Sequence, residues 1–357
     1  EGLFETVAGQ TQYGRHRDDW GNWFGNNNPA WLWHYFLPQQ YLARNPHLAV
    51  KSLRQYLANY ADSTRAYPIS RTIQRFNDIG MAGHVTSANS ATPYRDELFG
   101  PEFARSVFIS EPVHNLVHRE VLEPDGVSFK SRRAPDESER EFLASTDNWF
   151  RPITMKTGPD GALYIADMYR FVIEHPEWIP PDTQRSLDLR AGQDLGRIYR
   201  VYPVNATLRK VPRLDRLNAA GLVQALDSPN GWQRDTAQRL LVHSGDKTAA
   251  GPLEKMAVAS KNAKARLQAL CTLDGLDALT PKALAAATRD AEAAVRENAV
   301  RLSERFLAGD PAHGSGRASR APAEAAKLES ALLTLVDDPS LRVRYQLAFT
   351  LGEWRDI

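Results

Sequence analysis

The chain has 357 residues, a formal net charge of +1, 42% hydrophobic residues and 24% charged residues. This length favours two or three domains, and the composition is that of a globular protein rather than a disordered or fibrous one. A charge near zero creates no field that would gather nucleic acid or anionic lipid, so neither is expected as a partner. The single cysteine, Cys271, excludes an intramolecular disulfide, a thiolate zinc cluster and a covalent c-type haem site. The sequence contains no run of about eighteen apolar residues, which is the length needed to span a bilayer.

The two ends of the chain carry no typical terminal signals. The first residues lack a basic stretch followed by an apolar core, so they do not form a signal peptide. The chain starts without Met and ends at Ile357 without a recognisable capping helix. We therefore expect an internal piece of a longer protein.

Up to residue 204 the sequence predicts short antiparallel strands joined by tight turns. The strongest signal is a β-hairpin, in which residues 153–156 and 162–167 flank a Gly-Pro-Asp-Gly turn. Further strands are expected at residues 4–7, 107–110, 117–122 and 197–202. An insertion over residues 169–194 separates the hairpin from the last strand. Such units, repeated roughly every 50 to 80 residues, predict the blades of an all-β propeller.

Residues 205–213 are expected to form a linker to an all-α domain over residues 214–357. Four helical segments there carry an arginine followed three residues later by Ala or Leu: Arg234, Arg266, Arg296 and Arg344. These arginines are 32, 30 and 48 residues apart, which fits pairs of short helices stacked on one another. Such pairs resemble HEAT repeats. The arginines either pack between repeats or form a binding surface, and the Gly-, Ser- and Pro-rich residues 309–322 predict a flexible loop.

Several phrases carry a resemblance to known families. Residues 151–152, 158–164 and 196–201 look like one blade of the six-bladed propellers of the glucose/sorbosone dehydrogenase type. More specifically, three other phrases resemble the large membrane-bound dehydrogenase-like proteins of planctomycete-type bacteria: residues 14–27, 111–120 and 171–180. In that family a propeller precedes HEAT-like repeats and often a C-terminal cytochrome c domain. The early blades and a Cys-x-x-Cys-His motif are missing here, so the resemblance implies the last two or three blades of six, followed by a HEAT-like solenoid.

The resemblance also implies a function and a set of site residues. It implies a quinone-dependent sugar or alcohol dehydrogenase outside the cytoplasm, in the periplasm or beyond, which passes electrons to a haem c domain absent here. Pyrroloquinoline quinone and Ca²⁺ are the implied cofactors. In this reading His16 and His84 accept the proton of the substrate hydroxyl. Arg17 and Arg151 bind the anionic cofactor or stabilise developing oxyanions. As a fragment with open sheet edges, the chain alone is expected to be inactive and poorly soluble.

Hard oxygen donors gather next to His16 in the sequence. Asp18, Asp19 and Asn22 could supply ligands for Ca²⁺, although they lack the alternate spacing of an EF-hand loop. The alternative is a salt-bridged loop. His114 and His118 would share one face of a strand but lie about 13 Å apart at 3.3 Å per residue, too far for one metal ion. A structural role is therefore expected for this pair.

A second hypothesis is a non-catalytic scaffold that binds a glycan or a protein partner, with the helical surface as a docking site. Propellers host both enzymes and binding proteins, so fold alone does not choose between them. The sequence contains no GxGxxG, Walker or GxSxG motif, which argues against nicotinamide binding, phosphoryl transfer and α/β-hydrolase chemistry.

Overall fold

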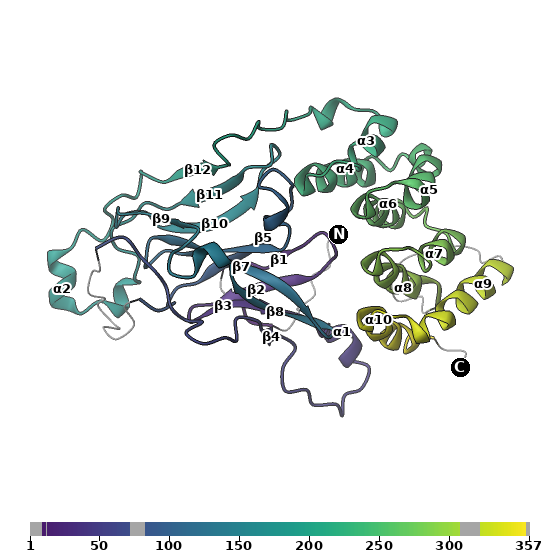
Figure 1. The fold of residues 1–357 in the computed structure, drawn as a ribbon, viewed down its shortest axis with the longest axis horizontal. Coiled ribbons are helices and arrows are strands. Elements are labelled where there is room, and N and C mark those ends of the chain that lie inside the picture. The colour runs from purple at the N-terminus through teal and green to yellow at the C-terminus, as the bar shows by residue number, and fades with distance from the viewer. Residues whose placement is uncertain (1–8, 12, 72–82, 308–321, 355–357) are drawn as a thin grey trace. The chain divides into compact units, whose positions relative to one another are not determined.

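The computed structural model describes residues 9–11, 13–71, 83–307 and 322–354 (Figure 1). The chain divides into two compact units, Glu1–Arg209 and Lys210–Ile357. The first unit is rich in strands and the second is helical, and the linker predicted over residues 205–213 spans the division between them. In the described part of the chain, no helix is both long and apolar enough to cross a membrane.

Three antiparallel sheets make up the first unit (Figure 1). The first sheet has the order β1 (His16–Arg17), β2 (Trp23–Asn27), β3 (Ala30–His34), β4 (Gln55–Tyr56). The second has the order β5 (Asn89–Pro93), β6 (Ser106–Glu111), β7 (Leu116–Asp125), β8 (Ser128–Arg133), and β9 (Leu143–Ala144) also pairs with β7. The third has the order β10 (Pro152–Thr157), β11 (Leu163–Asp167), β12 (Arg197–Val201). Two short helices, α1 (Gln39–Leu42) and α2 (Pro181–Ser186), lie in connections.

The propeller prediction is wrong. The described residues form three separate sheets of four, five and three strands, and these sheets do not close into a ring. Alternating apolar residues and Asp-Gly turns specify antiparallel neighbours within a sheet, but they do not specify how many sheets follow or how they close. The predicted strand over residues 4–7 lies outside the described residues.

The second sheet is buried on both faces, which places the core of this unit. All six residues of β6 are buried. Val107 and Ile109 of β6 join a cluster with residues of the first sheet, such as Phe24 and Trp31. Phe108, which points to the opposite face, joins a second cluster with Met155 and other residues of the third sheet. The second sheet therefore lies between the other two, and strand β5 contacts both β1 and β10.

The second unit consists of helices joined by short turns. They are α3 (Ala219–Ala225), α4 (Gly231–Ser244), α5 (Ala250–Ala259), α6 (Ala263–Gly275), α7 (Pro281–Ala287), α8 (Ala293–Leu307), α9 (Pro322–Leu333) and α10 (Leu341–Leu351). Successive helices pack as pairs, α3 with α4, α5 with α6 and α7 with α8. Asn218, Asn230, Asn262 and Thr280 cap their helices by accepting backbone N–H bonds. Of the loop predicted over residues 309–322, residues 309–321 lie outside the described part and Pro322 begins α9. The assignment to HEAT repeats stays a prediction.

The repeated arginines connect one helical pair to the next. Arg266 donates two hydrogen bonds of 2.6 Å to the carboxylate of Asp290, and Arg296 binds that of Asp338 in the same two-pronged way at 2.7 and 2.9 Å. Each of them also donates to a backbone carbonyl six residues earlier, as Arg234 does to Ser228 at 2.7 Å. These arginines therefore hold the turns of the helical unit together.

Candidate functional site

His16 lies where strands of all three sheets meet, because β5 contacts both β1 and β10. Its Nδ1 is 3.1 Å from the carbonyl oxygen of Ala91 and 3.3 Å from the hydroxyl of Thr92 on β5. A carbonyl only accepts hydrogen bonds, so Nδ1 carries the proton and Nε2 keeps a lone pair in the neutral ring. The side chain is half-buried. We call the place where β1, β5 and β10 meet the sheet junction.

Hydroxyl groups line the sheet junction beside His16. Ser90 Oγ lies 3.3 Å from Thr92 Oγ1 and 3.3 Å from Thr154 Oγ1, and it accepts a 3.1 Å bond from the backbone N–H of Met155. Ser90 is fully buried and has a backbone φ of +53°, in the left-handed region that a non-glycine residue adopts at a cost. The irregular pairing of β5 with β6 between Asn89 and Thr92 accommodates this conformation. The hydroxyls of β5 thereby reach β10.

Two cations act electrostatically at the sheet junction, Lys156 on His16 and Arg95 on Lys156. Arg95 forms a 2.7 Å ion pair with Asp19, and both side chains are largely buried. Burial, and then the charge of Arg95, lower the pKa of Lys156 on β10. Burial, followed by the charge of Lys156, lowers the pKa of His16 to about 4, so its imidazole is neutral at physiological pH. Within the described residues Lys156 has no carboxylate partner.

The other predicted catalytic histidine lies elsewhere. His84 forms an isolated β-bridge with Arg65, and its Nδ1 is 3.2 Å from the hydroxyl of Thr64. Arg17 follows His16 on β1 and is exposed. His16 and Arg17 are consecutive on β1, so their side chains point to opposite faces of the strand, and the structure does not bring His84 to them.

The carboxylates near His16 do not fit a Ca²⁺ site. Both oxygens of Asp18 accept hydrogen bonds, from the backbone N–H of Trp20 and from the backbone and side chain of Asn22. Burial raises the pKa of Asp18 in spite of these bonds. Asp19 is paired with Arg95. Oxygens that face N–H donors do not present the converging lone pairs that a hard cation requires, and across the described residues no three His, Cys, Asp or Glu side chains are grouped to hold a metal ion.

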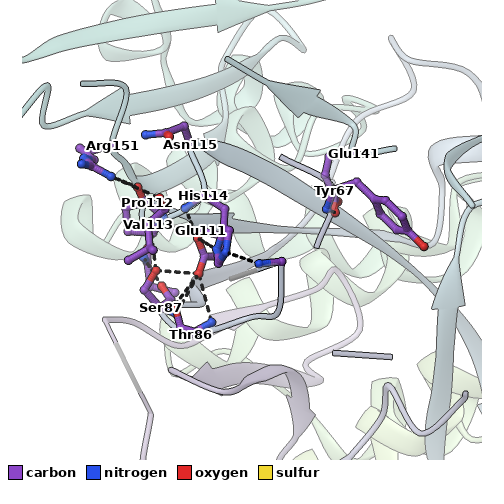
Figure 2. Close-up of polar contacts among 12 residues, drawn as sticks. Tyr67, Thr86, Ser87, Glu111, Pro112, Val113, His114, Asn115, Glu141 and Arg151 are labelled. Atoms are coloured by element: carbon purple, nitrogen blue, oxygen red, sulfur yellow. Dashed lines mark hydrogen bonds and ion pairs between the residues drawn. The ribbon is translucent and has the colours of Figure 1, made fainter. Parts of the chain in front are cut away.

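The loop between β6 and β7 is held by a buried carboxylate (Figure 2). Glu111 Oε1 accepts the backbone and hydroxyl hydrogens of Thr86 and Ser87 at 2.9 to 3.3 Å. Its Oε2 lies 2.6 Å from the backbone nitrogen and 3.1 Å from Nδ1 of His114. Burial alone would raise the pKa of Glu111, but the bonds and charge of His114 and the N–H of Thr86 outweigh it and lower the pKa to about 2.

Two more residues considered in the sequence, His114 and Arg151, make the remaining contacts of this loop. His114 Nε2 accepts the backbone N–H of Gly83 at 3.1 Å, so both of its ring nitrogens face protein atoms. Arg151 donates from its guanidinium to the carbonyl of Pro112 at 2.7 Å (Figure 2). It also donates to the carbonyls of Arg170 and Phe171, both at 2.9 Å. These contacts fasten the loop and do not fit the binding of an anionic cofactor by Arg151.

Sequence reasoning missed a third polar cluster, around His118 on β7. His118 Nδ1 is 2.7 Å from Glu141 and Nε2 is 2.9 Å from Glu120, and all three side chains are fully buried. Burial favours the neutral ring, but the two carboxylates outweigh it and raise the pKa of His118. Trp31 stacks on the imidazole with ring centroids 4.1 Å apart. The His118–Glu120 spacing is a visible signal for a shared strand face, whereas nothing local points to Glu141.

Comparisons with known proteins give a family but no activity. A family model described as "Domain of unknown function (DUF7133)" matches residues 1–205. None of the curated proteins matches the chain. Among solved structures, the crystal structure of an engineered protein is similar at 16% identity and a TM-score of 0.27, over 38% of this chain. The match covers 62% of that protein, which is less than two thirds of its length.

Proposed function

The chain belongs to the DUF7133 family, and we propose that its β-rich unit binds a small oxyanion, the carboxylate or phosphate group of a ligand, at the sheet junction. The observation that carries the proposal is Lys156, whose ammonium has no carboxylate partner in the described part of the chain although it acts electrostatically on His16. Its other charged neighbour, Arg95, is paired with Asp19.

The charged residues at the junction favour an anion as the ligand. Lys156 and Arg95 are both positively charged, and Asp19 pairs with Arg95. Lys156 lies on the exposed face of β10, yet burial and the charge of Arg95 lower its pKa, and burial and the charge of Lys156 lower that of His16. A positive charge on either group therefore carries a cost. A bound anion would relieve the cost for both groups at once.

The donors at the junction suit an oxyanion. The ammonium of Lys156 offers three N–H donors. Thr154, two residues earlier on the same exposed face of β10, adds a hydroxyl. Protonated His16 would add Nε2–H, because its Nδ1–H is already given to Ala91. Charge-assisted bonds of this kind are about twice as strong as neutral ones, and they recognise carboxylate and phosphate alike.

Calorimetric titration of the full chain with inorganic phosphate, and separately with acetate, tests the proposal. Ionic strength is held constant with chloride, because exposed charges are screened by salt. We expect saturable binding by at least one of the two anions. Lys156→Gln should weaken it about tenfold or more, the loss expected for one charge-assisted hydrogen bond, whereas Lys156→Arg should preserve it.

The matched control is Lys130→Gln on β8, because Lys130 is exposed and lies 3.8 Å from Glu123. This variant should bind like the unmodified chain. Absence of saturable binding by both anions, or equal weakening by the Lys156 and Lys130 variants, would contradict an oxyanion site at the junction.

One observation favours a second function, the sugar or alcohol dehydrogenase that the resemblance implies. Neutral His16 keeps a lone pair on Nε2, which is the form a proton acceptor needs. Dye reduction with a panel of sugars, with and without pyrroloquinoline quinone and Ca²⁺, tests this function. Reduction that is lost in His16→Asn would support it, and no reduction under any condition would leave anion binding as the function of the junction.

A further inference from the structure

The outer edge of the third sheet is open in the part of the chain that the structure describes. Strand β12 pairs with β11 through five consecutive residue pairs without a bulge, and β11 is its one partner there (Figure 1). Four of its five residues are exposed and Val201 is half-buried. In an antiparallel strand every second residue directs its N–H and C=O away from its neighbour. Strand β12 therefore presents unpaired backbone groups along a regular edge.

The continuous strand order of the third sheet contains three strands, whereas that of the first and of the second contains four. The first sheet runs β1-β2-β3-β4 and the second runs β5-β6-β7-β8, whereas the third stops at β12. Natural sheets commonly protect an edge with a bulge, a proline or charged side chains. Strand β12 has no bulge and no proline, and it exposes Ile198 to 71%. Its two charged residues, Arg197 and Arg200, are engaged with Tyr169 and Asp160 of the same chain. Such an edge is suited to pairing with another strand.

We propose that β12 pairs in antiparallel fashion with β12 of a second copy of this chain, about a twofold axis at Tyr199. Three strands from each copy would then form one continuous sheet. A twofold interface of this kind brings the same surface of both copies together, which is the commonest arrangement in homo-oligomers.

The sequence of β12 is compatible with itself in this register. Each Arg197 would lie opposite the partner's Val201, and each Ile198 opposite the partner's Arg200, so no like charges face each other directly. Both arginines already have contacts within their own chain. Arg200 lies 3.4 Å from Asp160, and the guanidinium of Arg197 stacks 3.5 Å from the ring centroid of Tyr169.

The two faces of the strand would contribute differently to the pairing. Ile198 and Arg200 share one face, so the aliphatic stem of each Arg200 would cover the exposed Ile198 of the other copy. Tyr199 lies on the opposite face, where its ring packs 5.7 Å from that of Phe150. That contact holds Tyr199 in place for pairing with its counterpart. An interface of one strand edge is small, so we expect a dissociation constant on the order of micromolar or weaker.

Sedimentation velocity of the full chain over a range of concentrations tests the proposal. We expect reversible conversion from monomer to dimer with rising concentration. Ile198→Lys should abolish the dimer, because an edge lysine opposes strand addition and would lie beside the partner's Arg200. The matched control is Val204→Lys, since Val204 is 95% exposed just beyond β12 and should leave the dimer intact. Added salt should strengthen the dimer, because it screens the arginines that come together.

Hydrogen exchange locates the contact without any substitution. The amide protons of residues 197–201 should become more protected as concentration rises, while those of β4, another short edge strand, should not change. A monomer at every concentration would overturn the proposal, and so would a dimer that Ile198→Lys leaves intact or one without added protection in β12. None of these residues belongs to the sheet junction, so the outcome is separate from that of anion binding.

Discussion

Glu111 is the residue on which the loop between β6 and β7 depends, since its carboxylate receives hydrogen bonds from Thr86, Ser87 and His114. Its pKa is depressed to about 2, so the stability it contributes is present above the unfolded-state value of 4.5 and is lost as pH falls from there towards 2. We predict that Glu111→Gln lowers the free energy of unfolding at pH 7 by an amount on the order of 3 kcal/mol. Urea denaturation at pH 7 and at pH 3 would measure it.

The control for Glu111 is Glu123→Gln, which removes an exposed carboxylate that pairs with Arg132 on the surface. We expect it to change stability little, because exposed ion pairs contribute little. At pH 3 the Glu111 variant and the unmodified chain should approach one another in stability. A difference that is the same at both pH values would mean that the loss comes from packing rather than from the ionised carboxylate.

His118 has the opposite pH dependence. Its pKa is raised by Glu141 and Glu120 against the effect of burial, so its contribution is complete below the unfolded-state pKa of about 6.5 and is lost as pH rises through the folded-state pKa. We predict that the unfolding free energy of the full chain falls as pH increases above that range. His118→Gln should be less stable than the unmodified chain at pH 6 and should lack this part of the slope. If the unfolding free energy depends on pH in the same way in His118→Gln and in the unmodified chain, His118 is not the group responsible.

At the scale of elements, replacing the arginine of a helical pair is predicted to lower the stability of the helical unit. Arg266 joins the turn before α6 to Asp290 in the turn before α8 through two bonds of 2.6 Å. Arg266→Ala should destabilise the helical unit by about 1–3 kcal/mol, since it removes a two-pronged charge-assisted contact together with the bond to Ser260. Arg289→Ala, at an exposed arginine next to Asp290, is the control and should have little effect. Thermal denaturation followed by circular dichroism at 222 nm would compare them.

Elements were predictable from sequence to the extent that their signals are local. The hairpin of β10 and β11 follows from two apolar runs around a Gly-Pro-Asp-Gly turn, and Gly161 in that turn has a φ of +92° that favours glycine. The helices with repeated arginines follow from their apolar period. Closure of a ring is not a local property, which is why strand patterns that fit separate sheets were read as blades. The short strands β1 and β4, with two residues each, carry too little pattern to predict.

The candidate site was predictable only in part for the same reason. His16 could be selected from its place beside an expected strand, and its neighbours Asp18 and Asp19 are visible with it in the sequence. Lys156 could not be selected, because its significance depends on β10 lying beside β5, and that contact joins residues more than sixty positions apart. The predicted roles of His84 in catalysis and of Arg151 in cofactor binding depend on partners that no motif records, and here those partners are a hydroxyl and backbone carbonyls.

At the scale of the whole molecule, the chain is two compact units, with polar clusters of different character in the β-rich one. The His118 and Glu111 clusters are closed, because each imidazole lies within 3.1 Å of a buried carboxylate. At the sheet junction Lys156, on the exposed face of β10, lacks a carboxylate partner among the described residues. That contrast is the reason for assigning ligand binding to the junction and structural roles to the other two clusters.

The most direct test of this account is the pKa of His16, measured by the chemical shifts of its imidazole during NMR titration with and without phosphate. Without phosphate the pKa should lie near 4. A bound anion favours the imidazolium, so saturating phosphate should raise the pKa, and by linkage phosphate should bind more tightly as pH falls. In the Lys156→Gln variant the pKa of His16 without phosphate should be higher than in the unmodified chain. Phosphate should raise it less. A pKa of His16 that saturating phosphate leaves unchanged would contradict an anion site at the sheet junction.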